Sequence, residues 1–485
     1  MLGHWLASLA IVLIAPPMGV DPDTAELVKQ LGASRYADRE AGGEALVKIG
    51  RAAVRELARA AEGSDPEIRL RAANLITRID AAELLGPTRL TLDLRDRPLA
   101  EAAAAIEATS GLRLRFPVVR GNLRDDNPWP DTRITLDTSG PRPFWEVVDR
   151  FCRTSGLQRG FLHHFASFRP PFEMALAPGK GRPPARDTGP FRVELLRVRY
   201  FRDRYYGPDD RGDDEGSAFG IKVDKATGVS EFSSYAAELL VSVEPKLRLF
   251  GIGAVEQAEA VDERGRSLLK LPAPEEEERR LALWKHNPDL DPRNHPGLRY
   301  GTGWRSSSVS MPFPIALSYP TPPAERIARL GGIVPVLAVG RRPDPLVVPL
   351  KGAKGKEFVA GKEKIRVHAI QDEQGREPVV EFTLETDRPD NEQTMTAYAA
   401  DGLALDVNRP IDMLTLRLEV IDGRGEPVFW QFNKTPSGNT QGRMAIVFNG
   451  PNGVRLRPDD LRIRCWRLVA VTADLPFEFR DVPTP

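Results

Sequence analysis

The chain has 485 residues, which is too long for one hydrophobic core and predicts three or four domains. Hydrophobic residues make up 41% and charged residues 28%, ordinary proportions for a soluble protein. The formal net charge is +0, from 68 Lys and Arg against 68 Asp and Glu, which excludes a global field that recruits nucleic acid or anionic lipid. The 43 prolines and 41 glycines favour β structure and turns over a mainly helical chain.

The first twenty residues have the pattern of a secretory targeting segment. Leu6–Ala15 is an unbroken run of small or apolar residues, closed by Pro16 and Pro17. Because a bilayer span needs about 20 apolar residues, the run is too short to cross one and suits the core of a signal peptide. We therefore predict a signal peptide over residues 1–20, a periplasmic or secreted protein and no membrane span in the mature chain. An uncleaved anchor is the alternative.

Residues 21–86 are predicted to be helical. Gly50 and Gly63 interrupt the helical pattern, and Ser64-Asp65-Pro66 begins the last helix with a capping residue followed by proline. The segment resembles HEAT-like repeats on Arg39-Glu40, Ile49-Gly50, Asp65-Pro66-Glu67 and Arg71-Ala72-Ala73. Solenoid surfaces usually bind protein, so the segment is either a partner-binding surface or a structural cap.

An internal repeat follows, with copies at Arg89–Phe116 and Arg133–Leu162. Each copy predicts strand, helix and strand, because alternating apolar residues precede and follow an apolar stripe at helical spacing. Pro98 and Pro143 suit the first helical position of each copy, and Gly111 and Gly156 suit a left-handed C-cap. The helical stripes are Leu99, Ala102, Ala103 and Ile106 in the first copy, and Phe144, Val147, Val148 and Phe151 in the second.

The repeat resembles the short N-terminal domain of secretins and TonB-dependent receptors, here called STN-like. The resemblance covers residues 88–168 and is carried by Thr109-Ser110-Gly111-Leu112 and Thr154-Ser155-Gly156-Leu157. It implies a periplasmic docking module without catalytic residues, with one sheet and both helices on a single face. Trp145 lies just off the second stripe and, if exposed, is the candidate for a partner contact.

The remaining chain is predicted to be β-rich. A linker rich in proline, glycine and basic residues covers 169–189, and two β-sandwich-like domains follow at 190–350 and 356–485. Four-residue turns with Asp first and Gly last are expected at Asp262–Gly265, Asp372–Gly375 and Asp422–Gly425. The predicted class is therefore multidomain α+β. Cys152 and Cys465 fall in different predicted domains, so no disulfide is expected.

Few side chains suggest a chemical site. The best metal-like cluster is His286, Asp289, Asp291 and His295, whose imidazole and carboxylate ligands suit a divalent metal. The cluster lies in a loop broken by proline, which favours a solvated polar loop, and we predict neither a metal nor a cofactor. We likewise favour solvated surface for three other groups: the acidic loop Asp209, Asp210, Asp213, Asp214 and Glu215; the pair His163 and His164; and the basic stretch Lys351, Lys354, Lys356, Lys362 and Lys364.

The motifs of common enzymes are missing from the sequence. It has no G-x-S-x-G elbow, no phosphate loop of the form G-x-x-x-x-G-K-[ST], no H-E-x-x-H and no C-x-x-C. We therefore expect a non-enzymatic interaction or scaffold protein, exported by a bacterium, that binds an envelope protein through the HEAT-like and STN-like region. One alternative is a β-sandwich enzyme acting on extracellular polymer. The other is an array of carbohydrate-binding modules that stacks glycan on aromatics such as Trp284, Tyr300, Trp304 and Tyr319.

Overall fold

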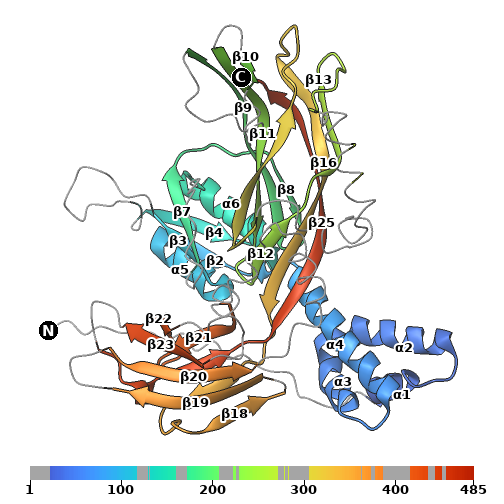
Figure 1. Cartoon of the computed structure of the whole chain (residues 1–485), viewed down its shortest axis with the longest axis vertical. Coiled ribbons are helices and arrows are strands. Elements are labelled where there is room, and N and C mark those ends of the chain that lie inside the picture. Colours follow the sequence, from blue (N-terminus) through green and yellow to red (C-terminus); the bar gives the residue numbers. More distant parts are fainter. Residues whose placement is uncertain are drawn as a thin grey trace. The chain divides into compact units, whose positions relative to one another are not determined.

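The protein combines helices with a larger share of strand, which confirms the α+β class (Figure 1). It divides into two compact units, Met1–Glu83 and Leu84–Pro485. In the described part of the chain, no helix is long and apolar enough to cross a membrane. The structure is a computed structural model and describes residues 22–116, 129, 132–159, 172–206, 222–224, 229–270, 278, 282, 305–361, 363–372, 377–385, 416–434, 443–449 and 455–485.

The first unit is helical, as predicted. Its helices are α1 (Pro22–Gln30), α2 (Tyr36–Ile49), α3 (Val54–Ala61) and α4 (Pro66–Leu85), with a short 3-10 turn, η1 (Gly50–Ala53), after α2. Asp65 caps α4 by accepting the backbone N–H groups of Glu67 and Ile68 at 2.8 and 3.1 Å. The unit has its own apolar core, formed by Leu31, Leu46, Ala53, Leu57, Ala72, Leu75 and Ile79.

The repeat forms two matching halves. Helices α5 (Leu99–Ser110) and α6 (Phe144–Ser155) both begin after an extended proline and end at a left-handed glycine, with φ of 73° at Gly111 and 71° at Gly156. The two prolines are therefore N-caps, one position earlier than predicted. Every stripe residue named from the sequence is buried, and the two stripes share one core. That core confirms the predicted helical faces.

The two halves are linked reciprocally through their backbones. The first N–H of α5, at Leu99, bonds Thr132 O at 2.7 Å, and the first N–H of α6, at Phe144, bonds Thr88 O at 2.8 Å. Strand β1 (Arg89–Leu90) pairs with β5 (Arg142–Pro143), and β2 (Asp93–Pro98) pairs with β4 (Arg133–Asp137). Each copy of the repeat therefore follows a carbonyl that accepts a hydrogen bond from the first N–H of the helix in the other copy.

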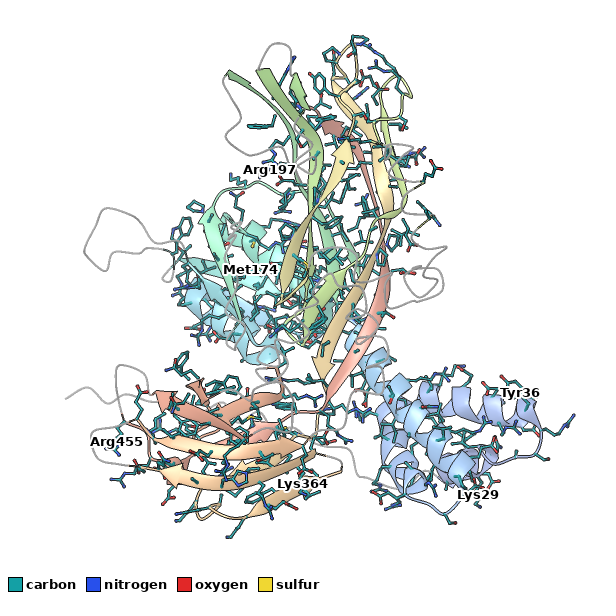
Figure 2. All side chains as sticks on the ribbon, in the orientation of Figure 1. Lys29, Tyr36, Met174, Arg197, Lys364 and Arg455 are labelled. Atoms are coloured by element: carbon teal, nitrogen blue, oxygen red, sulfur yellow. The ribbon has the colours of Figure 1, made fainter. Side chains whose placement is uncertain are left out.

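The prediction of one sheet in the repeat was wrong. The strands form three small sheets: β1–β5, β2–β4, and β3 (Leu112–Arg115), β7 and β6 (Leu157–Arg159) in that order. Strand β7 (Phe172–Pro178) runs parallel to β3 and antiparallel to β6, so the two return strands never pair directly. Met174 of β7 packs against the shared core (Figure 2). Part of the predicted linker therefore belongs to the repeat.

Long strands build the next region. One five-stranded sheet contains β8 (Ala185–Thr188), β9 (Phe191–Tyr206), β10 (Lys222–Asp224), β11 (Val229–Val243) and β15 (Ser310–Leu317). A second contains β12 (Leu247–Ile252), β13 (Glu256–Asp262), β14 (Arg305–Ser308), β16 (Arg326–Arg341) and β25 (Leu468–Pro483). The predicted turn at Asp262–Gly265 forms, with Gly265 N–H bonding Asp262 O at 3.0 Å.

The C-terminal strands form a nearly closed antiparallel barrel rather than the predicted sandwich. Apolar residues from every strand point into one core, which includes Phe382, Phe448 and Trp430. The predicted turn at Asp422–Gly425 connects β21 to β22, whereas part of Asp372–Gly375 lies outside the described residues. The order is β17 (Leu346–Pro349), β24 (Arg462–Cys465), β21 (Leu418–Ile421), β22 (Pro427–Lys434), β23 (Arg443–Asn449), β20 (Val379–Glu385), β19 (Glu363–Gln371) and β18 (Glu357–Ala360), with a 3-10 turn, η5 (Pro458–Asp460), before β24.

Strand pairing also corrects the predicted boundary between the two β domains. Strand β17 was assigned to 190–350 but pairs with β24 inside the barrel. Strand β25 was assigned to 356–485 but pairs along all of β16, from Arg326 opposite Pro483 to Arg341 opposite Leu468. The barrel is therefore inserted between two neighbouring strands of another sheet, an arrangement that local sequence patterns do not encode.

Candidate functional site

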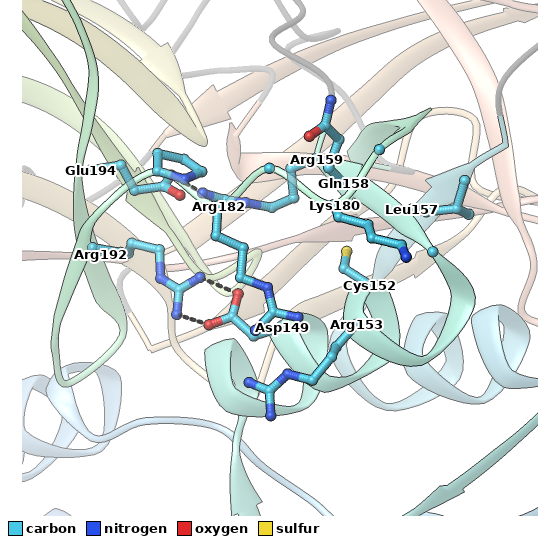
Figure 3. A pocket seen from close by; sticks show the side chains of 15 residues that line it. Asp149, Cys152, Arg153, Leu157, Gln158, Arg159, Lys180, Arg182, Arg192 and Glu194 are labelled. Atoms are coloured by element: carbon cyan, nitrogen blue, oxygen red, sulfur yellow. Dashed lines mark hydrogen bonds and ion pairs between the residues drawn. The ribbon is translucent and has the colours of Figure 1, made fainter.

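A basic pocket of about 490 Å³ lies where the second half of the repeat meets β8 and β9 (Figure 3). Its wall comes from the last turn of α6, from β6, from the segment between β7 and β8, and from β9. The side chains that matter below are Asp149, Arg153, Gln158, Arg159, Lys180, Arg182, Arg192 and Glu194. The volume falls within the usual range for small-molecule sites, about 300–1,000 Å³.

Two glycines bring the segment between β7 and β8 close to the repeat. A Cβ atom at Gly179 or Gly181 would lie 2.6 Å from side-chain atoms of Gln158, so only glycine fits this approach without a shift. The N–H of Gly179 bonds the carbonyl of Gly156, the C-cap of α6, at 3.2 Å. The intervening Lys180 and the following Arg182 are thereby held at the pocket wall.

Trp145 lies beneath this pocket and is 3% exposed. Its indole N–H donates to Pro190 O at 3.0 Å, and its ring meets Phe144 edge-on at 4.9 Å. The guanidinium groups of Arg192 and Arg159 lie 5.0 and 5.3 Å from the ring centroid. The exposure required for a partner contact is therefore absent, and Trp145 instead supports the arginines of the pocket.

Arg192 is 3% exposed and fully engaged with two carboxylates. Its Nη1 and Nη2 donate to Asp149 at 2.6 and 2.7 Å, and its Nε and Nη2 donate to Asp187 at 2.5 and 2.8 Å. Burial alone would lower the pKa of Arg192, but the hydrogen bonds that Arg192 donates to Asp187 and Asp149 outweigh it and raise the pKa. This fixed cation joins α6, β8 and β9, so its role is structural.

Arg159 is a second buried cation, with 15% of its side chain exposed. It pairs with Glu194, whose side chain is 2% exposed. Burial and the neighbouring charge of Arg192 lower the pKa of Arg159 to about 10. Arg159 remains charged at neutral pH. Its lowered pKa shows that the pair with Glu194 does not fully offset the cost of burying the guanidinium beside Arg192.

Three further cations at the pocket are exposed: Arg153, Lys180 and Arg182. None of them makes an ion pair or side-chain hydrogen bond to another described residue. Figure 3 shows Arg182 crossing in front of the Asp149–Arg192 pair and Lys180 extending above Cys152. These side chains are available donors for an anion entering from solvent.

The pocket offers donors but no activated nucleophile. Cys152 is its one thiol, and burial raises the pKa of Cys152 to about 11, so the reactive thiolate is scarce at neutral pH. Serine, threonine and histidine are missing from the described lining, and both nearby carboxylates are held in arginine pairs. The arrangement suits binding of an anion.

The other side chains named from the sequence fall into two groups. His286, Asp289, Asp291 and His295 lie outside the described residues, as do His163, His164, the acidic loop 209–215, Trp284, Tyr300 and Trp304. Within the described part of the chain, no group of three His, Cys, Asp or Glu could hold a metal ion. Lys351, Lys354 and Lys356 are exposed, and Tyr319 is 40% exposed and stacks on Tyr200 at 4.1 Å.

Sequence reasoning missed this pocket because its residues are scattered. Lys180 and Arg182 were assigned to a linker, and Arg159 and Arg192 belong to strands on either side of it. The available signal was the alternation of glycine with cations in Gly179-Lys180-Gly181-Arg182.

Comparison of the chain with protein-family models, with curated proteins and with solved structures found no match.

Proposed function

We propose that this chain is a non-enzymatic interaction protein of a bacterial cell envelope, and that its repeat binds an anionic group of a partner. The observation that carries the proposal is the basic pocket, where Arg153, Lys180 and Arg182 are exposed around a fixed framework of buried ion pairs. The buried pairs fix the wall that carries these cations, so the backbone does not have to be ordered when an anion binds.

The chemistry of the pocket supports binding over catalysis. General acid–base work needs a group that changes protonation near neutral pH, and nucleophilic work needs an activated side chain. The pKa values of Arg159 and Cys152, about 10 and about 11, lie far above that range. A partner can therefore be held here without being transformed.

Two other features fit an exported interaction protein. Leu6–Ala15 supports export, although it lies outside the described residues. The helical unit presents Tyr36 and Leu70 with 66% and 64% of their surface exposed, and Figure 2 labels Tyr36 at one end of α2. The resemblance to HEAT-like repeats implies a protein-binding surface on this unit.

The test compares three versions of the full chain immobilised under the same conditions. The pocket variant carries Arg153→Gln, Lys180→Gln and Arg182→Gln. The matched control carries Lys351→Gln, Lys354→Gln and Lys356→Gln, which removes three exposed cations from the barrel. Partners retained from envelope extract are quantified by mass spectrometry at low salt and at 0.5 M salt.

Wild type and control should retain the same partner, and high salt should release it because the contact is ionic. The pocket variant should retain at least about tenfold less, since a charge-assisted hydrogen bond contributes about 1.5–3 kcal/mol. Equal retention by all three proteins would contradict the proposal.

A further inference from the structure

The charge around the pocket leaves an excess of about two positive charges. Five cations line it: Arg153, Arg159, Lys180, Arg182 and Arg192. Three carboxylates oppose them, namely Asp149 and Glu194 in the lining and Asp187 on Arg192. A dianion neutralises that excess, whereas a single carboxylate leaves one positive charge uncompensated.

The available donors also come from more than one direction. Arg153 projects from the last turn of α6, and Lys180 and Arg182 project from the segment before β8. The amide of Gln158, on β6, donates to Pro178 O at 3.4 Å and has one further N–H. A planar carboxylate is best matched by one guanidinium fork. A tetrahedral phosphate presents three terminal oxygens and accepts from several sides at once, including from the compact ammonium of a lysine.

The size of the pocket adds a third constraint. At about 490 Å³ it matches a small organic ligand, and a phosphate ion alone would leave most of it unfilled. Leu157, Pro183 and Ala185 provide apolar wall beside the cations. The ligand is therefore expected to have an organic body attached to its anionic group.

Building on the proposed function, we propose that the anionic group is an organic phosphomonoester, held by Arg153, Lys180 and Arg182 beside the Arg159–Glu194 and Arg192–Asp149 pairs (Figure 3). The group belongs either to a small molecule or to a phosphorylated side chain of the partner. Both sources share the same dianion at neutral pH, with a charge of about −1.5 to −2.

Protonation of the ligand distinguishes a phosphomonoester from a carboxylate. The second pKa of a phosphomonoester is about 6, so the group loses its second charge between pH 7.5 and pH 5. Aspartate carboxylates in a peptide keep most of their charge over this interval because their pKa values are about 4. Arg159 stays protonated throughout, since its pKa is about 10. A phosphomonoester should thus bind more weakly at pH 5, and a dicarboxylate should not.

The experiment is isothermal titration calorimetry on the full chain at low salt. The probes are glycerol 3-phosphate, a phosphoserine hexapeptide and inorganic phosphate, with a matched hexapeptide that carries two aspartates as the dicarboxylate. We expect glycerol 3-phosphate or the phosphoserine peptide to bind at least about tenfold more tightly than the aspartate peptide at pH 7.5. The same phosphate probe should bind about tenfold more weakly at pH 5 than at pH 7.5. Tighter binding of glycerol 3-phosphate identifies a small molecule as the source of the phosphate group, and tighter binding of the phosphoserine peptide identifies a phosphorylated side chain.

The variants described above provide the controls. The pocket variant should lose at least tenfold in affinity for the phosphomonoester, and the barrel variant should bind as wild type does. Arg182→Lys, which keeps the charge but removes the fork, should lose less than Arg182→Gln. Circular dichroism checks that each variant is folded, as expected for exposed positions.

Two outcomes would overturn the inference: the aspartate peptide binding as tightly as both phosphomonoesters, or phosphomonoester binding unchanged in the pocket variant. If inorganic phosphate binds more tightly than both organic probes, the inference that the ligand has an organic body is wrong. If no phosphate probe binds while the extract partner still depends on the pocket, the phosphomonoester is wrong and the proposed function stands. If neither phosphate binding nor retention of the extract partner depends on the pocket, the phosphomonoester inference and the proposed function are both wrong.

Discussion

Replacing Trp145 tests how tightly the base of the pocket is packed. Trp145→Ala removes a ring that is 3% exposed, contacts Phe144 edge-on and lies under Arg159 and Arg192. It also removes the indole donor to Pro190 O at 3.0 Å, which leaves that carbonyl with the backbone N–H of Glu244 as its other donor. In the sequence, Trp145 lies off the apolar stripe that contains Phe151, but both side chains are buried in the structure. The structure therefore predicts comparable costs for truncating the two side chains.

The magnitude follows from burial. Truncating a buried aromatic side chain to alanine costs about 3–5 kcal/mol, which applies both to Trp145→Ala and to Phe151→Ala, a fully buried residue of the same helix. Trp145→Phe keeps most of the ring volume but loses the indole hydrogen bond. It should cost about 1–2 kcal/mol, since one such bond contributes about 1 kcal/mol net.

Hydrogen exchange measured by mass spectrometry on the full chain is the suitable assay, because a chain with several domains does not unfold in two states. A fragment ending at residue 168 would lack β7, which joins the return strands of the repeat. In peptides covering α6, the loss of 3–5 kcal/mol should accelerate exchange by roughly a hundredfold to several thousandfold. Peptides from the barrel report whether the effect is local.

Trp145→Ala protein whose α6 peptides exchange at the wild-type rate would refute the buried placement of Trp145. The same result for Phe151→Ala would refute the packing of the two helical stripes on one core. Equal effects of Trp145→Phe and Trp145→Ala would show that the hydrogen bond to Pro190, rather than ring packing, dominates.

Three further outcomes are expected. Cys152 and Cys465 should resist alkylation at pH 8 in the native protein and react in guanidinium, because burial raises their pKa values to about 11 and about 12. Their contribution to the free energy of unfolding is complete below about pH 9 and is lost as the pH rises through these values. Unfolding measured from pH 8 to pH 11 would reveal this loss. Gly156→Ala should cost about 1–2 kcal/mol in the exchange assay, because its φ is 71° while the space around a Cβ is open, and an unchanged rate would contradict the left-handed cap. Sequencing of protein from the native host should begin near Val20–Asp23, and an intact Met1 in a cytoplasmic fraction would contradict export.

The repeat was the most predictable part of the fold because its signals are local. Helical spacing placed both stripes in the core, and Gly111 and Gly156 marked both helix ends. The sheet arrangement was not predictable in the same way, since β7 enters between the two return strands from outside the repeated sequence. A duplication shows which segments are equivalent but not which later strand completes them.

The candidate site was less predictable than the fold. Burial of Trp145 depends on Pro190, and the engagement of Arg192 depends on Asp149, 43 positions earlier in the chain. Such pairs leave no periodic trace in a single sequence. The same limit explains why the sequence predicted a sandwich instead of the barrel. Alternating apolar residues identify strands, but they do not determine whether the sheet formed by those strands closes.

The inserted barrel has a consequence for how the chain is built. Strand β16 leaves the ribosome long before β25, and the whole barrel is made between them. During this time one edge of β16 can pair with β12 and β13, which precede it in the chain. The other edge, which pairs with β25, stays open until β25 is synthesised. The barrel can complete its own core during that delay. Joining Arg341 to Leu468 through a two-residue turn would therefore convert β16 and β25 into a simple hairpin and release the barrel as a transplantable domain.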